Sequence, residues 1–307
     1  MANALCWQAG LIFLAQAAHA DCAAPEGDFQ ATICADPGLR AKAEAIWTTA
    51  TETLAQNRNP WVALGLRRSI RHQLDAYGNA WDYAKAQPED SGACDDEPSS
   101  CAETWFTKDW LAERLERLSS FAADPSNLAL LREEMRFRRK FTGGPFGHDD
   151  ANCGLLEPWV LERPYEDLHC AGTFRIQHHD RVCTAEVTWA SGHYMTDLRV
   201  DQIVAGQPVL KGRCSILDQG GWGSEPFCPE MSIDAPQVGW TTAPDDFSDP
   251  LVARPDLDPM DPGETDVVAM AMLGPDGLPG GFAPPLTDWF QTCLTTPDYP
   301  PPDQVRE

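Results

Sequence analysis

Long apolar segments are scarce in this chain. After the first 20 residues, no run approaches the ~20 apolar residues that span a bilayer, so we expect no membrane span. The sequence also lacks a Gly-x-Ser-x-Gly motif, a phosphate-binding loop and a dinucleotide-binding fingerprint. These absences predict a protein without a cofactor and without catalytic activity.

Positive charge is scarce as well. The chain has 23 Lys and Arg against 47 Asp and Glu, which gives a formal net charge of -24. Such a charge repels nucleic acid and anionic lipid, so we expect neither as a partner. It attracts cationic partners through a field that salt screens. Solubility alone is the alternative explanation of this charge. No pattern in the sequence sets an oligomeric state.

The N-terminus reads as an export signal. Residues 11–20 are mainly apolar, and Ala18 and Ala20 provide the small side chains that precede a signal-peptidase cut. We therefore expect a signal peptide over residues 1–20, a mature chain that begins at Asp21, and a periplasmic or secreted location. This leader has no Lys or Arg, and a buried N-terminal helix is the alternative.

Cysteine supports the same interpretation. The chain has 11 cysteines, and cleavage would remove Cys6 and leave an even number. An even set in an exported chain points to disulfides, because an oxidising compartment preserves them. The mature cysteines are Cys22, Cys34, Cys94, Cys101, Cys153, Cys170, Cys183, Cys214, Cys228 and Cys293.

Residues 21–142 predict a helical domain. Four helices are expected: one from the Asp36-Pro37 cap, one over about Trp61 to Lys85, one capped by Ser99 or Ser100, and one over 124–140. Gly143-Gly144-Pro145 ends the last helix and marks the expected domain boundary.

Residues 146–296 predict a β-rich domain. Strands are expected over 174–177, 182–189, 194–204, 209–217 and 267–273, with a short closing helix over 286–294. The Pro- and Asp-rich stretch 241–266 is expected to be a solvated loop, and the tail 297–307 to be frayed. The whole chain is thus predicted as α+β, a stapled helical domain followed by a small antiparallel sheet or barrel.

The order of the helices suggests a disulfide pattern. In an antiparallel bundle the first four mature cysteines converge on one pole, where we favour the pairs Cys22–Cys34 and Cys94–Cys101 among several connectivities. In the second domain, Cys183 and Cys214 fall on the apolar faces of their strands. The preferred set there is Cys183–Cys214, Cys153–Cys170 and Cys228–Cys293, one of the ~15 connectivities that six cysteines allow.

Several of these features occur together over residues 21 to 121. The segment opens with Asp21-Cys22, continues with the run Ile33 to Leu39, and has Ala80-Trp81 late in the second helix and a loop cysteine before the last helix. It resembles the LprI-like lysozyme inhibitor domain. The matching motif positions are Asp36, Pro37, Leu39, Trp81, Arg114 and Leu118. The second domain faintly resembles netrin-like OB-barrel modules.

The resemblance implies a disulfide-stapled helical fold, export, and inhibition of a lysozyme. We therefore hypothesise an exported, non-enzymatic binding protein that inhibits a lysozyme-type peptidoglycan hydrolase. Lysozymes are commonly cationic, so an acidic protein would be steered toward them. The alternatives are a periplasmic metal-dependent enzyme that uses the histidines of the second domain, and an envelope scaffold protein.

The metal alternative rests on five histidines. They are His148, His169, His178, His179 and His193, and Asp149, Asp150 and Asp180 lie nearby in the sequence. None of them has the i, i+4 spacing of a metalloprotease helix, and a tandem pair on a strand would point to opposite faces. A calcium-loop pattern at 256–261 fails at Met260 and Asp261. We therefore predict no metal site.

Overall fold

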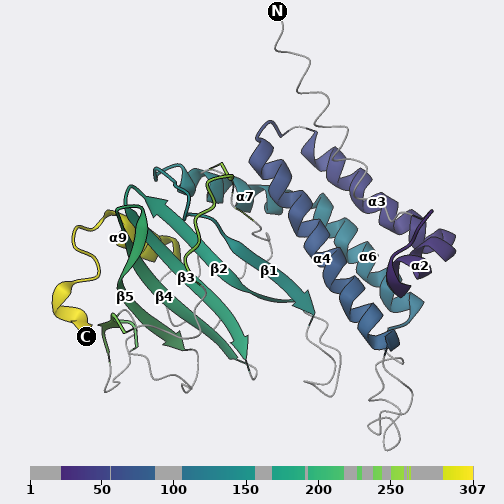
Figure 1. Cartoon of the computed structure of the whole chain (residues 1–307). Helices are drawn as coiled ribbons and strands as arrows, with labels where there is room; N and C mark the ends of the chain where they lie inside the picture. Colours follow the sequence, from purple (N-terminus) through teal and green to yellow (C-terminus); the bar gives the residue numbers. More distant parts are fainter. Residues whose placement is uncertain are drawn as a thin grey trace, which may run out of the picture. The chain divides into compact units, whose positions relative to one another are not determined.

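The computed structural model describes residues 22–55, 57–86, 106–155, 168–190, 193–217, 227–229, 238–243, 250–258, 261, 263 and 286–306 (Figure 1). The fold is α+β, as predicted from a helical segment followed by a β-rich segment. The chain forms two compact units. The helical unit comprises residues 1–58, 70–127 and 154–168, and the sheet unit comprises 59–69, 128–153 and 169–307. Whether they fold independently, with a boundary at 143–145, stays a prediction.

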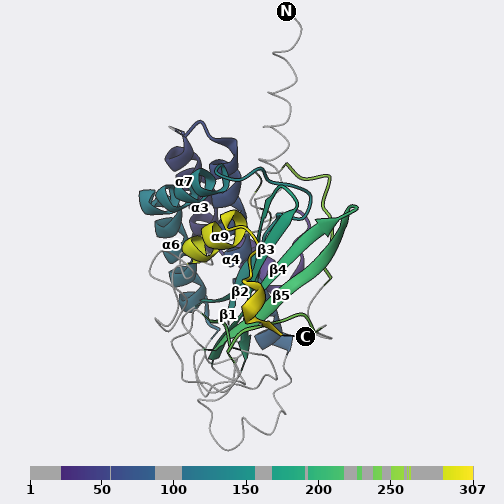
Figure 2. The ribbon, with the colours of Figure 1, turned by 90° about the vertical axis from the view of Figure 1, so that its left-hand side faces the viewer.

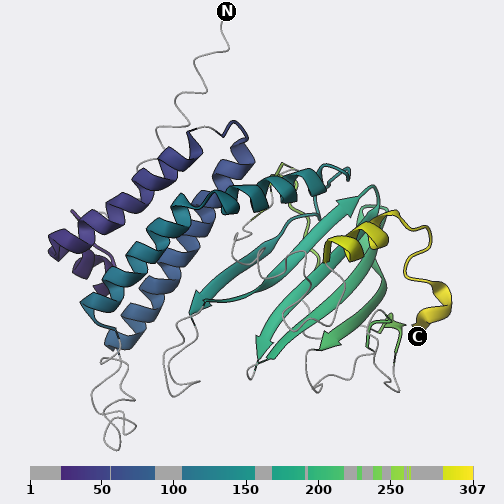
Figure 3. The same cartoon turned by 180° about the vertical axis from the view of Figure 1, so that it is seen from behind.

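The helical unit is built from α2 (Gly27–Ala35), α3 (Pro37–Leu54), the later part of α4 (Pro60–Ala86) and α6 (Lys108–Ala123). Figures 1 and 3 show α3, α4 and α6 side by side. Their shared core consists of aliphatic side chains that are fully buried, namely Ile46, Ile70, Leu111, Leu115 and Leu118. Within the described residues, no helix combines the length and the apolarity that crossing a membrane requires.

Capping confirms one predicted helix start and corrects another. The carboxylate of Asp36 accepts hydrogen bonds from the backbone N–H of Gly38 at 2.9 Å and of Leu39 at 3.3 Å, so α3 begins where its cap predicts. The prediction that Ser99 or Ser100 caps α6 is wrong. Thr107 caps α6 by accepting from the N–H of Trp110 at 3.1 Å. Ser99 and Ser100 lie outside the described residues.

A helix before Asp36 was not predicted. Residues 27–35 form α2, which ends one residue before the α3 cap. The sequence signal was the pair Phe29 and Ile33, four residues apart and both buried. Cys22 and Cys34 are only 12 residues apart in the sequence, so no helix was assigned to this segment.

The sheet unit contains a mixed sheet whose strand order follows the sequence. The strands are β1 (Asp150–Leu155), β2 (Leu168–His178), β3 (Arg181–Ala190), β4 (His193–Val204), β5 (Gln207–Leu217), β6 (Trp240–Thr241) and β7 (Val305–Arg306). From β2 to β5 the pairing is antiparallel, while β6 and β7 pair in parallel. The strands predicted at 174–177, 182–189, 194–204 and 209–217 are confirmed, and 267–273 lies outside the described residues.

Helices cover the apolar face of this sheet. The helix α9 (Leu286–Thr295), confirmed as predicted, lies against one face of the sheet (Figures 2 and 3). The sheet unit also includes most of α7 (Pro125–Arg138), the helix predicted over 124–140. The buried side chains of this face come from four adjacent strands: Phe174, Ile176, Cys183, Ala185, Leu198, Val200, Cys214 and Ile216.

The disulfides confirm one predicted pair and overturn two. Cys22–Cys34 forms as expected. The predicted pairs Cys183–Cys214 and Cys228–Cys293 are wrong, because the structure joins Cys183 to Cys293 and Cys214 to Cys228. Cys183 and Cys214 do share a face, but β4 separates their strands, which places them about 10 Å apart and beyond disulfide reach.

The other two predicted pairs cannot be compared with the structure. Cys94 and Cys101 lie outside the described residues, and the side chains of Cys153 and Cys170 are not among those described. The Cys183–Cys293 disulfide ties α9 to β3 across 110 residues of sequence, whereas the two cysteines of Cys22–Cys34 are only 12 residues apart.

The tail and the acidic loop differ from expectation. The tail is not frayed, because Val305 and Arg306 pair with β6, and Tyr299 packs on Trp240 with ring centroids 5.5 Å apart. The stretch 241–266 is not solvated throughout, since Leu251 and Asp261 are buried. Aromatic packing holds the tail, whereas Leu251 packs on Phe146 and Val182 and Asp261 pairs with Arg68.

Candidate functional site

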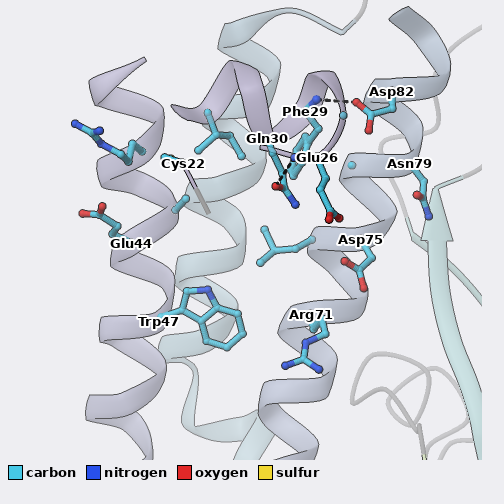
Figure 4. Close-up of a pocket in the computed structure, with 16 residues that line it drawn as sticks. Cys22, Glu26, Phe29, Gln30, Glu44, Trp47, Arg71, Asp75, Asn79 and Asp82 are labelled. Atoms are coloured by element: carbon cyan, nitrogen blue, oxygen red, sulfur yellow. Dashed lines mark hydrogen bonds between the residues drawn. The ribbon is translucent and has the colours of Figure 1, made fainter. Parts of the chain in front are cut away.

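The helical unit contains a groove of about 470 Å³ between α2, α3 and α4 (Figure 4). We call it the α2–α4 groove. Its lining consists of Cys22, Glu26, Gly27, Phe29, Gln30, Ile33, Arg40, Ala43, Glu44, Trp47, Arg71, Leu74, Asp75, Gly78, Asn79 and Asp82. All of them belong to the helical unit, so this unit alone forms the groove.

Close contacts hold α2 over α4. The carboxylate of Asp82 accepts a hydrogen bond from the N–H of Phe29 at 2.6 Å. Gly27 has a φ of 74°, and a Cβ at this position would overlap the Asp82 carboxylate. A Cβ on Gly78 would lie 3.2 Å from the ring of Phe29. Small residues at 27 and 78 therefore let α2 approach α4 closely, and the Cys22–Cys34 disulfide fixes the chain before α2 to its last turn.

The groove has an apolar floor and a charged rim. Phe29 and Ile33 are buried at its floor, and Trp47 and Leu74 are half-buried. In Figure 4, Trp47 on α3 and Arg71 on α4 extend toward each other, and Glu26 extends from the start of α2 toward α4.

Carboxylates outnumber guanidinium groups along this rim. Glu26, Glu44, Asp75 and Asp82 face only Arg40 and Arg71. Partial burial raises the pKa of Asp75, against the opposing effects of His72 and Arg71. An indole among excess carboxylates is an environment that favours a cationic side chain, through ion pairing and a cation–π contact.

Of the residues that carry the LprI-like resemblance, Cys22 and Ile33 line the groove, whereas the motif positions lie elsewhere in this unit. Asp36 and Pro37 start α3, and the others are buried: Leu39, Trp81, Arg114 and Leu118. The guanidinium of Arg114 lies 5.5 Å from the centre of the Trp110 ring, and Trp110 stacks on Trp81 at 6.3 Å. These residues build the bundle, so the resemblance bears on the fold more directly than on a binding surface.

The structure describes the side chains of three of the five candidate histidines, His148, His178 and His179. His148 is buried, and burial lowers its pKa. Its neighbour Asp149 forms an ion pair with Arg138, while Asp150 and Asp180 are exposed. The side chains of His169 and His193 are not described. Across the described ranges, no three His, Cys, Asp or Glu side chains are placed to hold a metal ion.

The tandem histidines do not point to opposite faces, contrary to the prediction. His178 ends β2, and its Nδ1 accepts a hydrogen bond from the N–H of Thr142 at 3.2 Å. His179 has a φ of 55° and belongs to the turn, so the two ring centroids lie only 4.2 Å apart. The prediction treated both residues as part of an extended strand.

No family model matches the sequence, and comparison with curated proteins and with solved structures finds no match either. The LprI-like resemblance therefore rests on the residues quoted above.

Sequence reasoning missed the groove. Its lining combines α2, which was not predicted, with polar residues on the outer faces of α3 and α4. The clearest sign of the groove in the sequence was Trp47, an aromatic residue that directly follows the core residue Ile46 and therefore lies on another face of α3.

Proposed function

We propose that this chain is a periplasmic or secreted binding protein without catalytic activity, and that its α2–α4 groove engages a cationic protein partner. A lysozyme-type peptidoglycan hydrolase is the concrete partner that the LprI-like resemblance implies. The observation that carries the proposal is the groove itself, where a half-buried indole lies among four carboxylates and two guanidinium groups. Disulfides support the location, because they persist in oxidising compartments.

The negative charge supports the proposal both at long range and at direct contact. The net charge of -24 steers a cationic partner from a distance and raises its association rate. At contact, the groove offers a partner's Lys or Arg both a carboxylate and an aromatic face. Aromatic residues in partly enclosed sites commonly dominate binding energy, so Trp47 is the expected centre of the interface.

Lysis of bacterial cell walls by a cationic lysozyme tests the proposal. The mature chain should slow lysis at micromolar concentration, and Trp47→Ala should weaken inhibition by about 2 kcal/mol, or ~30-fold. Asp75→Asn should weaken it less. Glu113→Gln is the matched control, because it removes an exposed carboxylate on α6, outside the groove. The proposal is overturned if several lysozyme types are unaffected, or if the control weakens inhibition as much as the groove variants.

A further inference from the structure

The sheet unit contains a second groove, formed by α7, β2 and α9, with a volume of about 400 Å³. We call it the α7–α9 groove. Its apolar lining consists of Leu130 and Phe137 from α7, Phe174 and Ile176 from β2, and Leu286 and Phe290 from α9. The volume and the lining of this groove are typical of a small-molecule site, which is concave and largely apolar and contains a few polar groups.

Both helical walls of this groove are fixed to the rest of the sheet unit. The Cys183–Cys293 disulfide ties α9 to β3, and Nη1 of Arg181 donates a hydrogen bond to the carbonyl of Cys293 at 2.9 Å. On the other side, Arg138 of α7 forms a buried ion pair with Asp149, whose Oδ1 accepts a hydrogen bond from the N–H of Arg175 on β2 at 2.8 Å. These contacts fix both walls of the groove, so binding does not have to order them.

The least exposed carboxylate that lines the groove is that of Glu134. Its Oε1 accepts a hydrogen bond from Nε of Arg138 at 2.7 Å, and its side chain is 19% exposed. Because Arg138 also pairs with Asp149, two carboxylates share one guanidinium in a buried position. Burial and the charge of Asp149 raise the pKa of Glu134, although Arg138 opposes this effect.

The other charges around the groove balance. Arg136 and Lys140 of the lining are offset by Glu133 and Asp288, and all four side chains are exposed. With Glu134 ionised, the unbalanced charge is the single negative charge of the Glu134–Arg138–Asp149 cluster. A cation at Glu134 would neutralise it where water screens poorly, whereas an anion would add to it.

We propose that the α7–α9 groove binds a small amphiphile that carries one ammonium group. Its apolar part lies on Phe174 and Ile176 between the two helices, and its ammonium group pairs with the carboxylate of Glu134. This site belongs to the sheet unit and is independent of the protein interface proposed for the helical unit.

Three ligands of equal chain length test the head-group preference. Decylammonium, decanol and decanoate are titrated into the full mature chain by calorimetry at pH 7, below the micelle concentrations of the two ions and the solubility limit of decanol. Decylammonium should bind about tenfold more tightly than decanol, and decanoate should bind most weakly. Equal affinities, no binding, or a preference for decanoate would each overturn the proposal, the last because it would mean that Arg136 and Lys140 dominate.

Variants then locate the site. Glu134→Gln keeps the shape and removes the charge, so decylammonium should fall to the affinity of decanol while decanol is unaffected. The matched control is Glu133→Gln, which removes an exposed carboxylate one residue away and should change affinity less than about twofold. Leu130→Trp should fill the groove and abolish binding of all three ligands. Retained binding in Leu130→Trp would refute the location, and circular dichroism verifies that each variant is folded.

Discussion

The two units of this protein both bury aliphatic side chains, but they differ in their buried ion pairs and in their disulfides. The helical unit has a core of fully buried aliphatic side chains, such as Ile46, Leu111 and Leu115, and a disulfide that closes a short loop. The sheet unit buries charges, with Arg138 paired to Asp149 and Arg68 paired to Asp261, and a disulfide that joins residues far apart in sequence. Truncating a buried aliphatic side chain to alanine costs about 2–5 kcal/mol, and removing one partner of a buried ion pair costs about 3–5 kcal/mol.

The largest effect should come from the long disulfide. Replacing both Cys183 and Cys293 by Ala opens a link across 110 residues, and in the chain-entropy model such a link stabilises by about 4.7 kcal/mol. Replacing both Cys22 and Cys34 opens a link across 12 residues and should cost about 2 kcal/mol less. Denaturant unfolding measures both losses, and equal losses would contradict the loop-length argument.

The same pair of variants tests the domain boundary. If the units fold independently, loss of Cys22–Cys34 should lower one thermal transition and leave the other in place. A single transition that shifts as a whole would mean that the two units unfold together and that the boundary predicted at 143–145 is wrong.

The next largest loss of stability should come from the removal of a buried charge. Arg138→Met leaves Glu134 and Asp149 buried without their shared cation, so the free energy of unfolding should fall by about 3–5 kcal/mol. Arg139→Met is the matched control, because Arg139 is exposed, and it should change stability by no more than about 0.5 kcal/mol. A small effect of Arg138→Met would show that the ion cluster does not support the sheet unit.

A helix cap in the other unit should matter less. Asp36→Ala removes the two hydrogen bonds that start α3, so it should lower the free energy of unfolding by less than Arg138→Met does. These bonds, with an ion pair to Lys108, hold the pKa of Asp36 below its ordinary value. The loss should therefore be present at neutral pH and vanish as the pH falls through that lowered pKa, which chemical unfolding at several pH values can verify.

The smallest expected effect is a pH dependence that depends on His148. Burial lowers the pKa of this imidazole, so the folded state resists protonation more than the unfolded chain does. The contribution of the neutral imidazole to stability is then fully present above the ordinary histidine pKa of about 6.5, and it declines as the pH falls below that value. His148→Gln should flatten this part of the stability curve, and an unchanged slope would refute the role of His148.

Much of the fold could be predicted because its signals are local. The Asp36-Pro37 cap located α3, and alternation located β3, β4 and β5. Ala205 and Gly206, which lie between the strands predicted over 194–204 and 209–217, have positive φ angles and form the turn between β4 and β5. Disulfide partners could not be derived in this way, since Cys183 and Cys214 satisfy the same alternation and only the position of β4 between their strands shows that they cannot bond.

The candidate sites were harder to predict than the fold. The α2–α4 groove needs α2, whose two buried residues fall between disulfide-bonded cysteines. The α7–α9 groove needs two helices that are about 150 residues apart in sequence, and only tertiary packing brings them together over β2. The charge that makes Glu134 distinctive comes from Asp149, a residue that the sequence offered as a candidate metal ligand.

Direct binding to a cationic lysozyme tests the central claim. Titration calorimetry with the mature chain should give a measurable affinity at low ionic strength that falls as salt is added, because the Debye length shortens to ~8 Å at physiological ionic strength. Trp47→Ala should weaken this binding, and Glu113→Gln should not. Absence of binding at low salt, or binding that Trp47→Ala leaves unchanged, would contradict the assignment of the α2–α4 groove as the interface.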